Sequence, residues 1–430
     1  MTEPFRLTAK EAAKQIADGK LTSEKLVASC LGRITAREPE VGAWFFLDPE
    51  LALSQARALD KGPSRGKLHG VPVGVKDIIE TMDMPTGYGS GIYTGNRTAW
   101  DAPSVALMRQ AGAVAMGKTV TSEYAGYNPG KTVNPHNKTR APGISSSGSA
   151  AAVADYMVPI AFGSQTGASI IKPAAFCGPV GYKPTYGTFV LGGVHPLASS
   201  LDTLGYFARD VDDLSLFGAV LGHRPSFGEG LPERAPRLGL CRTAEWDRLA
   251  APEVRKAVEN AAKALAKEGA QVADVTLPAE CDKLNAACVT VIRYECARLL
   301  AHEYRVKRDG LSKTMQGVIE DGNKIPYADY RAALDLAAHC RRAIAPIFEQ
   351  YDALITPSAE CEAAPIENPI GDSVFSRLWT ILHVPCLAMT TELSAGLKLP
   401  VGIQLIGMLN EDEKLLRISR WVEQRVKLKL

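Results

Sequence analysis

The chain has 430 residues, of which 46% are hydrophobic and 22% charged, a composition typical of a globular protein with a large buried core. Its 49 basic and 47 acidic residues give a formal charge of +2, so no global field attracts nucleic acid or an anionic membrane. No run approaches 18 uninterrupted apolar residues, which excludes a membrane-spanning helix. We therefore expect a small-molecule substrate and neither a nucleic-acid nor a membrane partner.

The N-terminal segment and the cysteines favour a cytoplasmic location. Residues 1–20 carry acidic side chains early and contain no apolar core of signal-peptide length. The nine cysteines form no CxxC pair, and an odd number cannot all be bridged within one chain. We therefore expect reduced thiols, most of them packed as small hydrophobic groups.

The N-terminal region is predicted to be helical. Thr8 and Glu11 have capping-box spacing, ahead of an apolar pattern of helical period. A second helix is expected to start near Thr22 or Ser23, because apolar residues at helical spacing follow.

Beyond these helices, short apolar segments predict strands. They are 41–47, 71–75, 113–116, 156–162, 237–241, 271–277, 352–356 and 401–407. Helical patterns lie between many of them, for example at 252–267 and 411–426. This alternation predicts an α/β fold with a mostly buried sheet.

We predict one domain spanning residues 1–430. The segment 128–205 is rich in Gly, Ser and Pro, but it is not a linker because strand and helix patterns run through it. A boundary at 222–236 is an alternative, although strand patterns on both sides favour one continuous sheet. The helical region 280–345 is expected to form an appendage over one end of the sheet, covering the active site.

The segment GAVAMGKT at 112–119 matches a phosphate-loop pattern, but its context does not fit. Such a loop cradles phosphate with flexible, glycine-rich backbone between a strand and a helix. Here the residues between the glycines form an apolar strand pattern, and the preceding VALMRQA is helical. The chain also contains no HExxH, no carboxylate cluster at ligand spacing and no GxSxG. We expect neither a metal nor another cofactor.

Two serine- and glycine-rich segments carry the strongest chemical signal. PGISSSGSAAAVA (142–154) places serines in a turn before an alanine-rich helix, and GSQTGASIIKPAAFCG (163–178) has a second turn that ends at Ser169. Either one alone is readily explained as a turn with a helix cap. Together with GVPVGVKDIIE (70–80) they are far more specific.

These three segments resemble the amidase signature family, and the resemblance covers most of the chain. It implies one large α/β/α unit, in which helices surround a mixed central sheet, and hydrolysis of amide-type C–N bonds. The family's catalytic lysine, bridging serine and nucleophilic serine fall on Lys76, Ser145 and Ser169. The bridging serine of the family commonly has a cis peptide bond.

The chemistry explains why these residue types are needed. An amide carbonyl is a weak electrophile, so the Ser169 hydroxyl must lose its proton as it attacks. Lys76 can accept this proton, through Ser145, only when it is neutral, and its position after an apolar strand favours the required desolvation. The alternative is a surface lysine paired with Asp77. Backbone N–H groups of the turn are expected to form the oxyanion hole; its residues are Thr166, Gly167, Ala168 and Ser169.

Several positions depart from the family pattern. Ala168, Ile144 and Ser147 replace glycines. Gln165 replaces an aspartate, and Lys172 stands one residue later than the usual arginine, whose structural charge it is expected to replace. If the backbone at Ala168 required a positive φ, alanine would be strained there and the oxyanion hole would shift.

The substrate follows only from the resemblance. Gln165, Tyr127 and Trp379 fall where family members often line the pocket, although core packing is an equal alternative for each. We expect an amidase that cleaves small aryl or aliphatic amides, or carbamates as a urethanase does, through a Ser169 acyl-enzyme. The alternatives are an A-type amidotransferase subunit that releases ammonia from glutamine for tRNA-linked amidation, an ester-preferring hydrolase, and an inactive binding protein on the same fold. We expect a monomer or homodimer.

Overall fold

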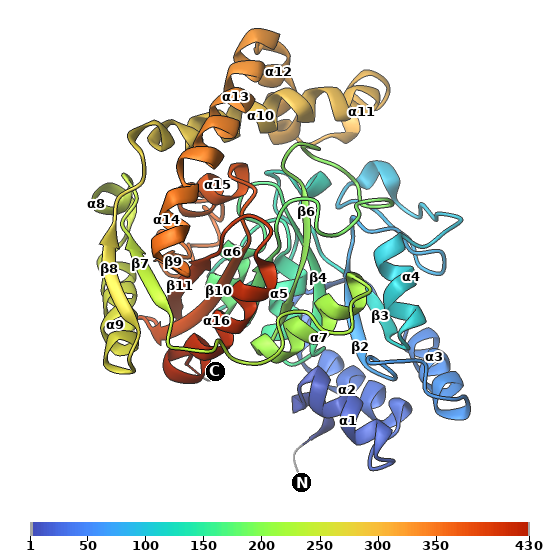
Figure 1. The fold of residues 1–430 in the computed structure, drawn as a ribbon. Coiled ribbons are helices and arrows are strands. Elements are labelled where there is room, and N and C mark those ends of the chain that lie inside the picture. Colours follow the sequence, from blue (N-terminus) through green and yellow to red (C-terminus); the bar gives the residue numbers. More distant parts are fainter. Residues whose placement is uncertain (1–2, 429–430) are drawn as a thin grey trace.

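The computed structural model describes residues 3–428 and contains one 11-stranded sheet with helices packed around it (Figure 1). The strand order is β1-β3-β2-β4-β6-β5-β10-β11-β9-β7-β8. The strands are β1 (Trp44–Phe46), β2 (Pro72–Lys76), β3 (Val114–Thr119), β4 (Ile160–Gln165), β5 (Val180–Lys183), β6 (Thr203–Ala208), β7 (Arg237–Cys241), β8 (Gln271–Val275), β9 (Ala353–Pro357), β10 (Cys386–Leu393) and β11 (Pro400–Ile406). Parallel and antiparallel pairs both occur, so the predicted α/β fold with a mixed sheet is confirmed.

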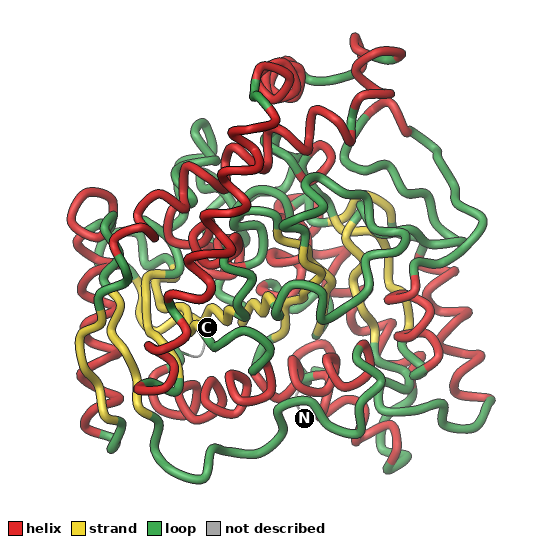
Figure 2. Tube along the Cα trace, turned by 45° about the horizontal axis from the view of Figure 1, so that its top comes forward, coloured by secondary structure: helices red, strands yellow, loops and turns green. Residues whose placement is uncertain are grey.

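Helices cover most of the sheet, so that most of its strands run through the interior of the molecule, whereas the edge strand β8 is largely exposed (Figure 2). The helices are α1 (Ala9–Ala17), α2 (Ser23–Val41), α3 (Pro49–Lys61), α4 (Pro103–Gln110), α5 (Ser147–Ala154), α6 (Ile171–Cys177), α7 (Val211–Leu221), α8 (Trp246–Leu249), α9 (Pro252–Lys267), α10 (Leu284–Leu299), α11 (Ala301–Val306), α12 (Lys313–Lys324), α13 (Tyr327–Ala343), α14 (Ala345–Gln350), α15 (Val374–Ile381) and α16 (Asp412–Val426). The capping box of Thr8 and Glu11 is present at the start of α1, and α2 begins at Ser23 after an N-cap at Thr22.

Two parallel strands bring the predicted chemistry to one edge of the sheet. β2 and β4 are neighbours, with Val73 paired to Ile160. Their residues are fully buried, as expected of parallel strands covered on both faces. β2 ends at Lys76 and β4 ends at Gln165, so both carboxyl ends lie at the same edge, where ligands bind in open α/β sheets.

Three strands are absent from the prediction, namely β5, β6 and β10. Glycine weakens the strand pattern of β6, yet Gly205 is required there, because a Cβ atom would lie 2.2 Å from the carbonyl oxygen of Tyr182 on β5. The predicted strand at 156–162 begins only at Ile160, since Tyr156 adopts a left-handed φ of 59° in the preceding turn. The predicted strand at 41–47 is shortened because α2 continues to Val41.

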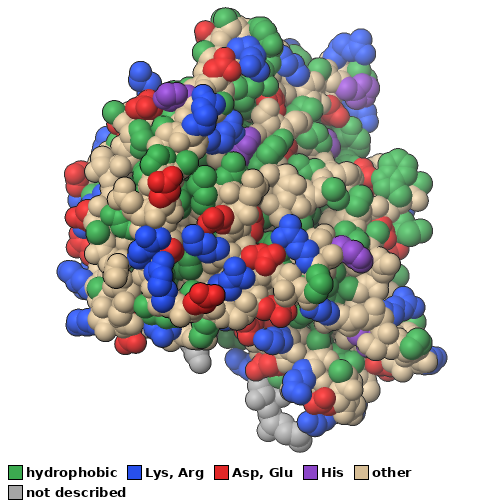
Figure 3. All heavy atoms as spheres, viewed as in Figure 1, with side chains coloured by type: hydrophobic (Ala, Val, Ile, Leu, Met, Phe, Trp, Pro, Cys, Tyr) green, Lys and Arg blue, Asp and Glu red, His purple; other side chains and the backbone are tan. Residues whose placement is uncertain are grey.

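Helices α10 to α13 stand together at one end of the molecule, at the top of Figure 1. They occupy most of the predicted helical region 280–345, and α10 also packs against α15. Among the described residues, no helix has both the length and the apolarity that a bilayer crossing requires. Basic and acidic side chains are interspersed over the face shown in Figure 3.

Candidate active site

Lys76 is buried at the end of β2 and contacts three serine hydroxyls. Its Nζ lies 2.5 Å from Ser145 Oγ, 2.9 Å from Ser146 Oγ and 2.8 Å from Ser164 Oγ. Burial lowers the pKa of Lys76 well below its usual range, although the charge of Asp202 opposes this shift. A neutral amine has two N–H donors and one lone pair, so one hydroxyl must donate to the nitrogen. This is the direction in which a proton would pass to a base.

The alternative reading of Lys76, a surface lysine paired with Asp77, is wrong. Lys76 has no exposed area, and Asp77 is buried beside Lys118, with an Oδ1–Nζ distance of 3.5 Å. Asp77 also accepts hydrogen bonds from the backbone N–H of Gly87. Asp77 therefore anchors the loop that follows β2.

Ser145 lies in the turn before α5. All peptide bonds between described residues are trans, so the cis bond that the resemblance implies at Ser145 is absent from this structure. The neighbouring Ser146 accepts a hydrogen bond from the backbone N–H of Ser164, which joins this turn to β4. Ser147 begins α5.

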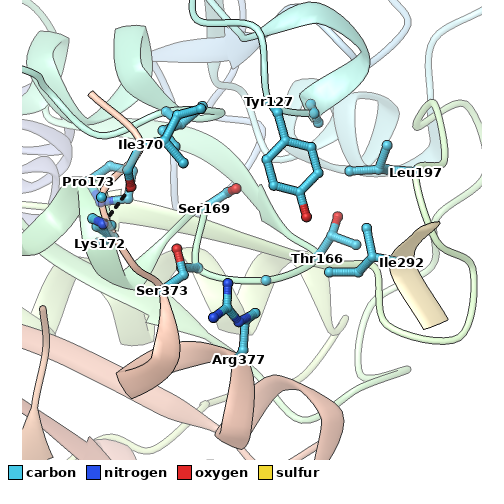
Figure 4. A pocket seen from close by; sticks show the side chains of 16 residues that line it. Tyr127, Thr166, Ser169, Lys172, Pro173, Leu197, Ile292, Ile370, Ser373 and Arg377 are labelled. Carbon is cyan, nitrogen blue, oxygen red and sulfur yellow. Dashed lines mark hydrogen bonds between the residues drawn. The ribbon is translucent and has the colours of Figure 1, made fainter. Parts of the chain in front are cut away.

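Ser169 is half-buried in the loop between β4 and α6 (residues 166–170), hereafter called the nucleophile loop after the role expected of Ser169, and it lines a pocket (Figure 4). Thr166 Oγ1 donates to a carboxylate oxygen of Asp202 at 2.5 Å. Asp202 also accepts from the backbone N–H groups of Leu197 and Ala198. Asp202 is buried, and burial raises its pKa to about 6. The Asp202 hydrogen bonds therefore tie the start of the nucleophile loop to the 197–202 segment.

Ala168 is not strained in place of glycine. Its φ is not left-handed, so the predicted oxyanion-hole residues need no glycine at this position. At Gly167 a Cβ atom would also have room, since its nearest neighbours would lie at 3.6 and 3.8 Å. The turn before Ser145 does need a glycine, because Gly143 has a φ of 95° and packs closely against Pro173. Sequence departures in the nucleophile loop are thus compatible with its backbone.

The pocket beside Ser169 is partly open to solvent, and the space between its walls, this opening included, is about 600 Å³. Its lining residues are Ala125, Gly126, Tyr127, Ile144, Thr166, Gly167, Ala168, Ser169, Lys172, Pro173, Leu197, Ile292, Ile370, Gly371, Ser373 and Arg377. Two of them are cationic and none is acidic. Lys172 Nζ is fully engaged by Glu360 Oε1 at 2.6 Å and by the carbonyl oxygens of Ile370 and Asp372 at 2.8 Å each.

Only one of the three expected substrate contacts lies on the pocket wall. Tyr127 lines the pocket, and its hydroxyl points into it (Figure 4). Trp379 does not: its indole is fully buried in the hydrophobic core, because α15 directs this large apolar side chain inward. Gln165 is also buried, and its amide group is used within the protein. Its Oε1 accepts from the N–H groups of Ile170 and Ile171, at 2.9 and 3.0 Å.

Three further residues lie at the site but were not predicted from the sequence, namely Ser164, Asp202 and Arg377. Ser164 and Asp202 could have been noticed as polar residues within the apolar patterns of 160–165 and 201–208. Arg377 gave no signal, since a single arginine on a short helix is ordinary. Within residues 3–428, no group of three His, Cys, Asp or Glu side chains is placed to hold a metal ion.

The chain matches the Amidase family model over residues 25–416 and therefore belongs to this family. It is 34% identical to the A-type subunit of the glutamyl-tRNA(Gln) amidotransferase of Chloroflexus aurantiacus, with 100% of both chains covered. A solved amidase structure is 30% identical with a TM-score of 0.90, covering 98% of this chain and all of the other. Native peptide amidase from Stenotrophomonas maltophilia is 28% identical with a TM-score of 0.83, covering 98% of this chain and 97% of the other. The resemblance inferred from the sequence is confirmed, and family membership supports an amide-hydrolysing enzyme.

Proposed function

We propose that the protein hydrolyses amide-type C–N bonds of small molecules, with Ser169 as nucleophile. The observation that carries this proposal is the contact between buried Lys76, whose pKa is lowered, and Ser145 Oγ at 2.5 Å. A lysine whose pKa is lowered is neutral at a lower pH than usual, and in its neutral form it can act as a base. Ser169 lies on the wall of the pocket that a substrate would enter.

The reaction would proceed in two halves. Ser169 Oγ attacks the carbonyl carbon while its proton passes through Ser145 to Lys76. Backbone N–H groups of residues 166–169 stabilise the oxyanion. The C–N bond then breaks, and the departing nitrogen takes the proton back from Lys76 through Ser145. Water attacks the acyl-enzyme by the same proton route, releasing the acid and restoring Ser169.

The pocket supports small aryl or aliphatic amides and carbamates as substrates. Much of its wall is apolar, for example Ile144, Leu197, Ile292 and Ile370. Ile292 comes from α10, so we further infer that the helical region 280–345 covers the active site within a single domain. A substrate that fills this space is held mainly by burial of apolar surface.

A second candidate is the A-type subunit of a glutamine-dependent amidotransferase, which would act with partner subunits. The similarity to the relative from C. aurantiacus supports it. Two observations weigh against it. The alignment spans 489 positions, whereas this chain has 430 residues, so the relative has segments without a counterpart here. In addition, none of the described residues that line the pocket is acidic, and the ammonium group of glutamine would lack a charged partner there.

The test compares the protein with Ser169→Ala on anilides, primary amides including glutamine, aryl carbamates and matched esters between about pH 7 and 10. Turnover of amides or carbamates that disappears in Ser169→Ala would support the proposal. The exposed Ser54→Ala serves as the matched control and should be as active as the unmodified protein. If glutamine were the one substrate of the panel that is cleaved, with release of ammonia, the amidotransferase would be favoured. Equal inactivity on every substrate would favour an amidotransferase subunit that requires its partners, or an inactive binding protein.

A further inference from the structure

Arg377 is a pocket cation whose hydrogen-bond donors are only partly used by the protein. It belongs to α15, on the same wall as the nucleophile loop. Its Cγ lies 3.6 Å from the position that a Cβ atom on Gly167 would take, so the side chain crosses close to the loop. Figure 4 shows the guanidinium group of Arg377 on the same side of the pocket as Ser169 and Ser373.

One side of the guanidinium is fixed and another is not. Nη2 donates to Asp372 Oδ1 at 2.7 Å, which holds the group in position. Nε is buried and has no hydrogen-bond partner among the described residues. A buried donor without a partner is costly, and such groups in native proteins call for an explanation. Lys172 differs in this respect, because the protein engages its ammonium group with three oxygens.

The charged residues of the pocket wall indicate which kind of group would bind the unused N–H donors of Arg377. Lys172 is paired with Glu360, and Arg377 is paired with Asp372 through Nη2, but its Nε has no partner among the described residues and the pocket that Arg377 lines has no acidic residue. Arginine binds carboxylates through parallel N–H donors, and the strength of these bonds increases away from water. Only 18% of the Arg377 side chain is exposed.

We infer that Arg377 binds a carboxylate on the substrate and is a specificity-determining residue of this pocket. The enzyme therefore prefers amides that carry a carboxylate near the scissile bond over the corresponding neutral amides without it. This inference rests on the proposed function for its catalytic consequence. The carboxylate is carried by either the acyl part or the departing amine, and the two arms of the test distinguish these cases.

The kinetic test uses two matched pairs. For the acyl side, the 4-nitroanilide of succinic acid is compared with that of butyric acid; for the amine side, 4-acetamidobenzoate is compared with acetanilide. We expect a higher kcat/KM for the carboxylate in one pair. In Arg377→Met this preference, taken as the ratio within the pair, should fall at least about tenfold, mainly through KM. Arg377→Lys should retain part of it.

Arg293→Met is the matched control, since this arginine lies on α10 beside Ile292 but is not part of the pocket wall. It should leave the ratio unchanged. No preference for the carboxylate in either pair, or equal ratios with and without Arg377, would overturn the inference.

A binding measurement keeps the inference separate from the proposed function. Calorimetry with Ser169→Ala protein measures its affinity for the 4-nitroanilide of succinic acid and for 4-acetamidobenzoate. Tighter binding of one of these than of its neutral partner, weakened at least about tenfold by Arg377→Met, would support the inference even if no amide were cleaved. Turnover of neutral amides without such binding would support the proposed function and contradict this inference.

Discussion

Gln165 and Thr380, 215 residues apart in the sequence, meet in a hydrogen bond of 2.9 Å from Nε2 to Oγ1. Thr380 Oγ1 in turn donates to the carbonyl oxygen of Gly167 at 2.7 Å. The other end of the Gln165 amide accepts from the N–H groups that follow Ser169. One glutamine side chain therefore holds the nucleophile loop on both sides of the serine.

We predict that Gln165→Ala damages the loop and not the binding of substrate. Two buried N–H groups, those of Ile170 and Ile171, would lose their acceptor, at a cost of about 1–3 kcal/mol each. The free energy of unfolding should fall, and kcat should fall by about 10²-fold if the oxyanion donors move. Gln165→Glu keeps the acceptor and should be milder. Urea denaturation and steady-state kinetics check this; a higher KM at unchanged kcat and stability would show instead that Gln165 binds the substrate.

We predict that activity follows the neutral form of Lys76. Because burial lowers its pKa well below 10.5, kcat/KM should rise with pH and reach its plateau well below pH 10.5. Lys76→Met keeps most of the unbranched side chain but removes the amine, and it should abolish turnover at every pH. A pH–rate profile from about pH 5 to 11 measures this. A profile that still rises steeply above pH 10 would contradict a desolvated lysine base.

The same residue predicts a pH-dependent stability. In the unfolded chain Lys76 keeps its proton up to about pH 10.5, whereas the folded protein releases it at a lower pH. Between these two pH values the unfolded state binds the additional proton, so stability rises with pH, by up to about 1.4 kcal/mol per pH unit. Lys76→Met lacks this contribution. The stability difference between the protein and this variant should therefore shift in favour of the protein as pH rises, and a constant difference would contradict the shift.

The elements of the fold could be predicted where a local sequence pattern marks them. Strand β7 and helix α9 match their predicted bounds, because apolar period and flanking Pro and Gly define them. The 112–119 segment forms the end of a turn followed by β3, as its apolar pattern predicted. In contrast, Lys118 of β3 gave no sign that it would be buried with Asp77, because that pairing depends on the register of two parallel strands.

The pocket was harder to predict than the segments that build it. Lys76 and Ser145 meet because β2 and the turn before α5 reach the same sheet edge, and their sequence patterns marked both segments. The side-chain direction of Trp379 could not be read from its sequence, since a tryptophan on a short apolar helix packs equally well inward or against a pocket. The position of the Arg377 guanidinium group depends on its hydrogen bond to Asp372. Asp372 lies in a loop without regular structure, so no periodic sequence pattern marks it.

We predict that restoring the family glycine at position 168 brings no gain. The backbone of Ala168 lies outside the left-handed region, so alanine costs nothing there. Ala168→Gly should leave kcat within about twofold and lower the free energy of unfolding by about 0.4–1 kcal/mol, because glycine makes the unfolded chain more flexible. Thermal denaturation and kinetics on the best substrate test this. A large increase in kcat would mean that Ala168 distorts the oxyanion hole.

We predict that the buried pair of Lys172 and Glu360 controls both stability and the shape of the pocket. Only 3% of the Lys172 side chain and 11% of the Glu360 side chain is exposed, so Lys172→Met leaves a poorly hydrated carboxylate without its partner. A loss of about 3–5 kcal/mol is expected. The double variant Lys172→Met/Glu360→Leu removes both charges and should recover most of this loss.

Lys172→Met and the double variant should differ in the free energy of unfolding but not in KM. Lys172 also holds the carbonyl oxygens of Ile370 and Asp372, next to the pocket-lining residues Gly371 and Ser373. The double variant should therefore regain stability while its KM stays raised, because nothing replaces the two bonds to the backbone. A double-mutant cycle in urea, with KM measured for each variant, checks both effects. If the double variant recovered KM as well, the carboxylate alone, and not the tether to 370–372, would shape this wall.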